Sequence, residues 1–167
     1  SADARQAARR IVEAARTRKR AGTDLYKRTT GEGLREALMR VSTPNISDGS
    51  HHLPCCEGIR PLQPGLKVVG PAVTVRTYPG DWSKPVQAID VATPGDVIVV
   101  DAGGVGPAIW GELATNSAIQ RKVAGVVVDG GIRDTSDIRA LKFPAFSRLL
   151  CSNAGDPKGF GEINVPI

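Results

Sequence analysis

The sequence predicts an α/β protein in which parallel strands alternate with helices. Two apolar runs, at 97–101 and 123–128, are continuous rather than alternating, which is typical of strands covered on both faces. A helical stretch separates them, so the order is strand, loop, helix, strand, and such a unit forms a right-handed crossover. The composition agrees, because 41% of the 167 residues are hydrophobic but only 4% are aromatic, while 19 glycines and 12 prolines favour many tight turns.

The first 30 residues are predicted to form a basic helical extension to a main domain at 31–167. Residues 4–21 are rich in Ala and Arg without a helix breaker, and Gly22 ends the pattern. Residues 1–28 hold nine basic and three acidic residues, so they carry the excess charge of a chain with a net charge of +5. Without interleaved aromatic residues this pattern is typical of a solvated helix rather than a nucleic-acid arm, and a partner-binding or oligomer-contact helix stays open.

The main domain is predicted to alternate helices and strands. In order, these are a helix at 31–41, a turn that can cap a helix at 42–49, a strand at 66–75, a helix at 85–92, a strand at 97–101, a helix at 109–122, a strand at 125–128, a helix at 134–141 and a strand at 144–148. The first helix places Leu34, Leu38 and Val41 on one face. Gly70-Pro71 predicts a bend or a sheet edge, since Pro has no N–H to donate. The glycines at 103–106 predict a loop, but they do not match the GxGxxG pattern of a nucleotide site.

The cysteine, histidine and hydropathy patterns indicate the compartment of the cell in which the protein works. Cys55 and Cys56 are adjacent and Cys151 is alone, so there is no structural zinc spacing, and an odd number of cysteines fits a reducing cytosol. His51 and His52 are also adjacent and point in different directions, which favours solvated loop residues, with a site wall or subunit contact as the alternative. No apolar run approaches the roughly 20 residues of a membrane span, and the start is too polar for a signal peptide. These patterns predict a cytoplasmic protein.

Charged residues stand where the predicted strands end. Glu112 lies before the strand at 125–128, and Arg133 and Asp134 follow it. Ligands of α/β proteins bind beyond the carboxyl ends of the strands, so these side chains are expected to meet there. Two carboxylates and a guanidinium can hold a divalent cation together with an oxoacid anion. The alternative is that Asp134 only caps a helix beside a surface arginine.

Ordered motifs over residues 42–167 resemble the RraA-like family. The sequence carries TPNISD at 43–48, GPAVT at 70–74, PGDVIVVD at 94–101, WGELA at 110–114, GVVVDG at 125–130, IRD at 132–134 and GEINVP at 161–166. The family includes 4-hydroxy-4-methyl-2-oxoglutarate aldolases, also called 4-carboxy-4-hydroxy-2-oxoadipate aldolases, and the regulator of ribonuclease activity A. The resemblance implies an α/β/β sandwich of the swivelling-domain type, here with an extra N-terminal helix. It also implies a homotrimeric ring, in some members a hexamer, with sites at subunit boundaries.

The resemblance also implies roles for individual residues. The positions that match the family's catalytic residues are Arg133, Glu112 and Asp134. Asp134 is expected to hold Mg²⁺ or Mn²⁺, partly through waters, and Glu112 to order a water on the metal.

The substrate-binding positions that the resemblance implies surround the same residues. They are Gly111, Leu113, Ala114 and Arg133. The backbone N–H groups of Leu113 and Ala114 are expected to receive the substrate carboxylate, and Arg133 the pyruvyl oxygens.

The activity implied is that of a metal-dependent class II pyruvate aldolase, a carbon–carbon lyase acting on a small 2-oxo acid. Oxaloacetate decarboxylation passes through the same enolate, and a metal ion with an adjacent arginine stabilises that charge. A Schiff base at Lys122 or Lys142 is a weaker alternative. A non-catalytic regulator that binds a ribonuclease or helicase is the main one. Because the family continues beyond residues 164–166, the chain is expected to lack its C-terminal part.

Overall fold

The computed structural model describes residues 6, 9, 32–52 and 54–167 of the chain, which divides into two compact units at residues 1–57 and 58–167. Of the helix predicted at 4–21, only Gln6 and Arg9 are described, and both are helical. The predicted boundary between residues 30 and 31 lies outside the described residues, so the division at that point stays a prediction. The first unit contains α2 (Glu32–Arg40) and α3 (Thr43–Gly49).

The second unit is built on a seven-stranded sheet. Its strands follow the order β1-β6-β5-β3-β2-β7, and β4 pairs with β5 beside this path. The strands are β1 (Arg60–Pro61), β2 (Ala72–Arg76), β3 (Val97–Asp101), β4 (Ala108–Trp110), β5 (Gly125–Ile132), β6 (Ala145–Leu150) and β7 (Glu162–Ile163). Neighbouring strands β2, β3, β5 and β6 are parallel, as the sequence predicts, whereas β1 and β7 pair antiparallel at the two edges.

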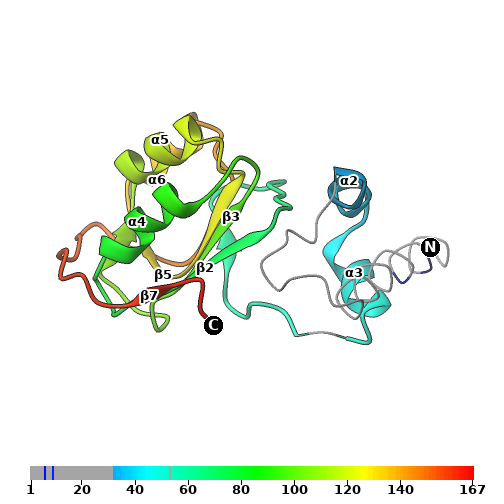
Figure 1. Ribbon diagram of the computed structural model, residues 1–167, viewed down its shortest axis with the longest axis horizontal. Coiled ribbons are helices and arrows are strands. Elements are labelled where there is room, and N and C mark those ends of the chain that lie inside the picture. Colours follow the sequence, from blue (N-terminus) through cyan, green and yellow to red (C-terminus); the bar gives the residue numbers. More distant parts are fainter. Residues whose placement is uncertain (1–5, 7–8, 10–31, 53) are drawn as a thin grey trace. The chain divides into compact units, whose positions relative to one another are not determined.

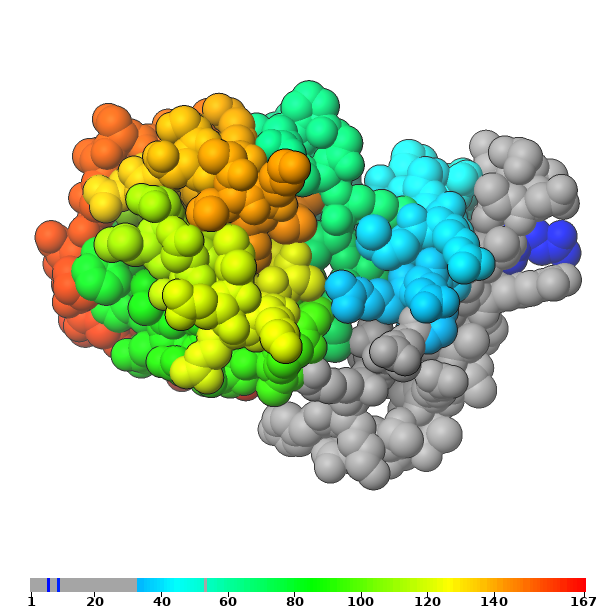
Figure 2. Space-filling view, turned by 90° about the horizontal axis from the view of Figure 1, so that it is seen from above, coloured from blue at the N-terminus to red at the C-terminus, as the bar shows by residue number. Residues whose placement is uncertain are grey.

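Three helices cover one face of this sheet. They are α4 (Ser83–Val91), α5 (Glu112–Gln120) and α6 (Thr135–Ala140), and Figure 1 shows them together on one side of strands β2, β3 and β5. Alternate strand residues such as Ile98, Val100 and Val126 are buried against them, together with Ile138 of α6. Figure 2 looks onto the helix side, where the green residues of α4 lie beside the yellow-green residues of α5.

The largest correction to the predicted elements falls before α5. A single helix was expected at 109–122, but residues 108–110 form β4 and the helix begins only at Glu112. Gly111 separates the two, with a fully extended backbone at φ −159° and ψ −162°. The apolar sequence Ala108-Ile109-Trp110 fits a buried strand as well as a helix, and its pairing with β5 decides between them.

The remaining corrections are smaller. The strand expected at 125–128 continues through Gly130 and Gly131 to Ile132, so these glycines lie inside a strand and not in a turn. The strand expected at 66–75 begins only after Pro71 and ends at Arg76. Residues 43–49 form a short helix rather than a plain turn, and the hydroxyl of Ser42 accepts the N–H of Asn45 at 3.5 Å.

The other predictions can be compared directly. All three cysteines are free thiols. His51 and His52 are exposed turn residues, and His52 lies 3.6 Å from the Asp48 carboxylate. Among the described helices, none combines the length and the apolar character that crossing a bilayer requires.

Candidate functional site

The start of α5 is fixed by a chain of buried polar contacts. The indole N–H of Trp110 donates to the hydroxyl of Thr115 at 2.9 Å, and that hydroxyl donates to the carbonyl of Gly111, also at 2.9 Å. Thr115 is fully buried and Trp110 is 2% exposed. These contacts hold the first turn of α5 rigidly against the end of β4.

Arg133 and Asp134 follow directly after β5, beside this helix start. The backbone N–H of Arg133 donates to the carbonyl of Trp110 at 3.0 Å, so the ladder between β4 and β5 carries the pair to the first turn of α5. Asp134 then adopts a left-handed backbone at φ 53° before α6 begins. This sharp change of direction brings the Asp134 side chain back toward α5.

The Asp134 carboxylate makes two contacts, and both involve predicted site residues. Its Oδ2 atom accepts the backbone N–H of Glu112 at 3.1 Å and lies 3.4 Å from Nε of Arg133. Asp134 occupies the N-cap position of α6, as the alternative interpretation has it, but its side chain makes no capping hydrogen bond there. Within the described part of the chain, Oδ1 of Asp134 has no protein partner.

Gly111 is required by this close approach. A Cβ atom at this position would lie 2.5 Å from Oδ2 of Asp134 and 3.2 Å from Cγ of Arg133. Its extended backbone is open to any residue, so the constraint is space and not conformation. The predicted site residues Gly111, Arg133 and Asp134 therefore meet in one place.

Glu112 takes part through its backbone more directly than through its side chain. The half-buried carboxylate of Glu112 turns along its own helix, where Oε1 accepts the side-chain amide of Asn116 at 3.3 Å. The same amide contacts the Glu112 carbonyl at 3.2 Å. The role of the Glu112 carboxylate at a metal stays a prediction.

A cavity of about 430 Å³ opens beside these residues. Five predicted site residues line it, namely Gly111, Leu113, Ala114, Arg133 and Asp134. The rest of the wall is largely apolar and includes Trp82 and Val86 from the start of α4. The prediction missed these two, because the helix was expected only at 85–92, whereas it begins at Ser83 with Trp82 as its N-cap.

The donors present fit a water-rich magnesium or manganese site rather than a closed metal cage. No group of three or more His, Cys, Asp or Glu side chains converges among the described residues. Mg²⁺ keeps several waters and is commonly bound by one or two carboxylates together with its substrate. Asp134, with a carboxylate side chain that is 35% exposed, offers one such ligand.

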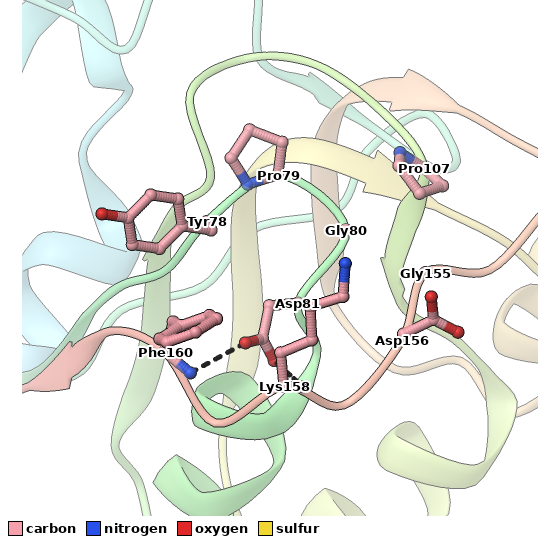
Figure 3. Close-up of a pocket in the computed structure, with 9 residues that line it drawn as sticks. All are labelled: Tyr78, Pro79, Gly80, Asp81, Pro107, Gly155, Asp156, Lys158 and Phe160. Atoms are coloured by element: carbon pink, nitrogen blue, oxygen red, sulfur yellow. Dashed lines mark hydrogen bonds between the residues drawn. The ribbon is translucent and has the colours of Figure 1, made fainter.

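A second cavity, of about 520 Å³, surrounds a carboxylate of a different kind (Figure 3). Asp81 is 2% exposed and accepts the backbone N–H groups of Ser83 at 2.9 Å, Lys158 at 3.2 Å and Phe160 at 2.8 Å. Burial raises the pKa of Asp81, but hydrogen bonds from Ser83, Phe160 and Lys158 outweigh it and place the pKa below the usual 3.8. Tyr78 stacks edge-on against Phe160 at the same cavity, with ring centroids 5.7 Å apart.

Comparison with known proteins identifies the family. The sequence profile of RraA-like proteins (Aldolase/RraA) matches residues 43–167. The chain belongs to the RraA-like family. The RraA-like α/β fold that the motifs predict is confirmed.

The RraA-like chain is similar to one protein named as an aldolase and to one that is uncharacterized. It is 46% identical over 110 residues to a protein of Halalkalibacterium halodurans provisionally named as a 4-hydroxy-4-methyl-2-oxoglutarate aldolase, in a match that covers 65% of this chain and 52% of that protein. It is 41% identical over 134 residues to an uncharacterized protein of Methanocaldococcus jannaschii, covering 78% of this chain and 63% of that protein. The chain thus spans less than two thirds of the length of both relatives.

A solved structure of a protein described as an inhibitor shares the fold. The RNA-processing inhibitor RraA from Thermus thermophilus superposes with a TM-score of 0.68 at 25% identity, covering 76% of this chain and 78% of that one. The RraA-like fold therefore occurs both in proteins named as aldolases and in one named as an inhibitor.

Proposed function

We propose that this RraA-like chain carries the active site of a divalent-metal-dependent pyruvate aldolase, a carbon–carbon lyase that cleaves 2-oxo acids of the 4-hydroxy-4-methyl-2-oxoglutarate type. One observation carries the proposal: Asp134 contacts both the Glu112 amide and Arg133 at the rim of a cavity. The names of the relatives support the same class of reaction.

The first turn of α5 is suited to the carboxylate of the substrate. The first four N–H groups of a helix lack acceptors within the helix, so the amides of Leu113 and Ala114 can donate to an anion. The positive end of the helix dipole favours that charge. Arg133 lines the same cavity and adds a planar, permanently charged guanidinium for the pyruvyl oxygens.

The reaction requires an enolate of pyruvate to be stabilised. The 4-hydroxyl loses its proton to a base, a carbonyl forms at C4, and the electron pair of the broken C3–C4 bond passes to the pyruvyl unit, which later takes a proton at C3. Arg133 stabilises the negative charge that develops on the 2-oxo oxygen. Asp134 would hold Mg²⁺ or Mn²⁺, with Glu112 contributing through water, and a bound divalent ion supplies Lewis-acid polarisation of the same oxygen.

Oxaloacetate decarboxylation is proposed as a side activity. There the C3–C4 bond also breaks, but C4 leaves as carbon dioxide and its electron pair forms the same pyruvate enolate. The groups that bind the 2-oxo acid end would therefore serve both reactions.

A coupled pyruvate-release assay on the full-length protein tests this function. With Mg²⁺ or Mn²⁺ we expect pyruvate to be released from 4-hydroxy-2-oxo acids, and we expect excess EDTA to abolish it and added metal to restore it. Undiminished release in excess EDTA would exclude a metal-dependent enzyme. Borohydride trapping of pyruvate on the protein would indicate a lysine mechanism instead.

A non-catalytic regulator is the second candidate, favoured by the structural similarity to the inhibitor RraA. In that case the protein would bind a ribonuclease or helicase through a surface distinct from Asp134. Capture of ribonuclease E by the wild type and by a variant without Asp134 alike, with no pyruvate release by either, would favour the regulator. For either function we propose a homotrimeric ring or a hexamer, which sedimentation velocity distinguishes from a monomer.

A further inference from the structure

One peptide unit connects the core of the domain to the candidate site. The carbonyl of Gly111 and the N–H of Glu112 belong to the same planar peptide, so they point in opposite directions. The N–H donates to Oδ2 of Asp134 at 3.1 Å. The carbonyl accepts two hydrogen bonds from Thr115, one from its backbone N–H at 3.1 Å and one from its hydroxyl at 2.9 Å. Whatever holds the carbonyl therefore also decides where the donor to Asp134 points.

The Thr115 hydroxyl is held in turn by a buried indole. The indole N–H of Trp110 donates to it at 2.9 Å, and both side chains are at most 2% exposed. An indole N–H can only donate and a carbonyl can only accept, so the hydroxyl proton must point to Gly111. Every donor in the resulting chain points the same way, from the indole through the hydroxyl and the peptide to the Asp134 carboxylate.

The common direction of these bonds strengthens the last of them. Hydrogen bonds aligned in this way polarise one another, so the indole and the hydroxyl make the Glu112 N–H a better donor to a negative charge. Solvent cannot replace the inner bonds, because Thr115 is 0% exposed. The peptide is therefore both oriented and polarised toward Asp134.

Thr115 acts from behind the site, not within it. Arg133 and Asp134 line the cavity of about 430 Å³, whereas Thr115 does not. Trp110 contributes twice, because its backbone carbonyl accepts the Arg133 N–H at 3.0 Å while its indole reaches Thr115. This pair of side chains thus joins the segment that carries Arg133 to the first turn of α5.

We propose that Thr115 is a positioning residue for the candidate site, supported by Trp110, and that its hydroxyl fixes the peptide 111–112 so that the N–H holds the Asp134 carboxylate in place. The consequence for metal binding and turnover rests on the proposed function, whereas the hydrogen-bond chain itself does not. A threonine that only stabilised the start of α5 would affect folding and leave the bond to Asp134 unchanged.

The backbone amide proton of Glu112 reports this chain directly in NMR spectra of the full-length protein without metal. Thr115→Val keeps the shape of the side chain but removes the hydroxyl, so the Gly111 carbonyl loses one donor. We expect the Glu112 amide proton to move upfield and to exchange faster with solvent, because its bond to Asp134 weakens. Thr115→Ser keeps the hydroxyl and should restore the wild-type shift.

Thr77→Val is the matched control for the loss of a buried hydroxyl. Thr77 is 6% exposed, and its hydroxyl also donates to a backbone carbonyl, that of Asp81, at 2.8 Å. Both valine variants should unfold at lower urea concentrations than the wild type, but only Thr115→Val should change the Glu112 amide. An equal change at Glu112 in both variants, or no change in Thr115→Val, would overturn the proposal.

Trp110→Phe tests the chain one link earlier. The Thr115 hydroxyl can then still donate to Gly111, but it no longer receives the indole N–H. The Glu112 amide proton should therefore move upfield by less than in Thr115→Val. If Thr115→Val does not fold, this variant carries the test, and an unchanged Glu112 amide in it would overturn the proposal.

Mn²⁺ binding and pyruvate release separate this inference from the proposed function. Residues that orient a metal ligand typically contribute 10–100-fold to metal affinity or activity, so Thr115→Val should weaken Mn²⁺ binding and lower kcat/KM by about tenfold each, with Thr77→Val unchanged. Electron paramagnetic resonance of free Mn²⁺ measures the binding. If the Glu112 amide moves as expected but the wild type neither binds Mn²⁺ nor releases pyruvate, the positioning of Asp134 stands and the aldolase function fails. If the wild type releases pyruvate and Thr115→Val keeps its Mn²⁺ affinity and kcat/KM, the aldolase function stands and the positioning role fails.

Discussion

Two carboxylates, Asp81 and Asp134, lie just before helices α4 and α6 and beside separate cavities, yet their surroundings differ. Asp81 is 2% exposed and accepts three backbone N–H groups. Asp134 has a carboxylate side chain that is 35% exposed, with one backbone N–H and one loose contact to Arg133. The first is saturated with donors from the fold, whereas the second has room for a further partner.

This contrast indicates that Asp81 stabilises the fold, whereas Asp134 is available to a ligand. The donors to Asp81 come from segments more than 70 residues apart, so its charge ties the turn before α4 to the C-terminal residues 158–160. The single backbone donor to Asp134 fixes its position at the start of α5, and Oδ1 has no partner among the described residues. We therefore expect substitution of Asp81 to cost stability and substitution of Asp134 to cost activity.

The largest expected effect is that of Asp134→Asn on catalysis. Asparagine tolerates the left-handed backbone at φ 53°, and its side-chain oxygen can still accept the Glu112 N–H, but it has no charge for a cation. We expect kcat/KM for pyruvate release to fall by at least about 10²-fold. Steady-state kinetics at saturating Mg²⁺ measures this loss.

Urea unfolding of Asp134→Asn tests whether this substitution leaves the stability of the protein unchanged. Because the hydrogen bond to α5 is kept, the free energy of unfolding should change by less than about 1 kcal/mol. A variant with wild-type kcat/KM, or one whose activity loss matches its loss of folded protein, would place Asp134 with Asp81 as a structural residue.

Asp81→Asn is expected to act on stability instead. Asparagine has one acceptor oxygen where the carboxylate has two, so at least one of the N–H groups of Ser83, Lys158 and Phe160 would face an NH₂ group. We expect the free energy of unfolding to fall by about 2–3 kcal/mol at pH 7, with kcat per folded molecule nearly unchanged. A loss of kcat without a loss of stability would contradict the structural role.

Acid titration of the Asp81→Asn variant sharpens this result. The pKa of Asp81 is lowered on folding, so the ionised carboxylate contributes stability above its unfolded value of 3.8, and that contribution is lost as pH falls through the lower folded value. The stability difference between wild type and variant should therefore be constant from pH 7 to about 5 and shrink below about pH 4. A difference that grows at low pH would mean that the charge of Asp81 is not what stabilises the fold.

The sequence predicts Asp134 as a site residue but gives no sign of the role of Asp81. The reason is that the donors to Asp81 lie far away along the chain. The Arg133-Asp134 pair follows a long apolar strand, where α/β proteins bind ligands, so its position is readable from local pattern. Asp81 receives two of its donors from residues 158 and 160, and no periodicity relates segments so far apart. The buried strand at 97–101 was predicted to the residue, because a continuous apolar run leaves little choice.

The start of α5 shows where local pattern is insufficient. Ala108, Ile109 and Trp110 fit a helix or a buried strand equally well, and only pairing with β5 makes them β4. The sequence likewise places an acidic residue at 112, but only the structure shows that its backbone N–H holds Asp134 while its carboxylate contacts Asn116. That Gly111, Arg133 and Asp134 lie together was thus predictable, and the contacts that join them were not.

The smallest expected effect is that of Gly111→Ala, which fills the space between Gly111 and Asp134. In Gly111→Ala the new Cβ would lie 2.5 Å from Oδ2 of Asp134, so the carboxylate must move away from the Glu112 amide. The backbone at φ −159° accepts alanine without strain, and stability should stay within about 1 kcal/mol of the wild type. Misplacing a catalytic group by 1 Å lowers the rate about 10²-fold, and we expect a displacement of a few tenths of an ångström to lower kcat/KM about tenfold.

Gly33→Ala is the matched control, because nothing lies within 4 Å of a Cβ there and activity should be unchanged. If Gly111→Ala kept full activity, the contact between Asp134 and the Glu112 amide would not be needed for turnover, and Asp134 would act from a position other than the one it occupies here.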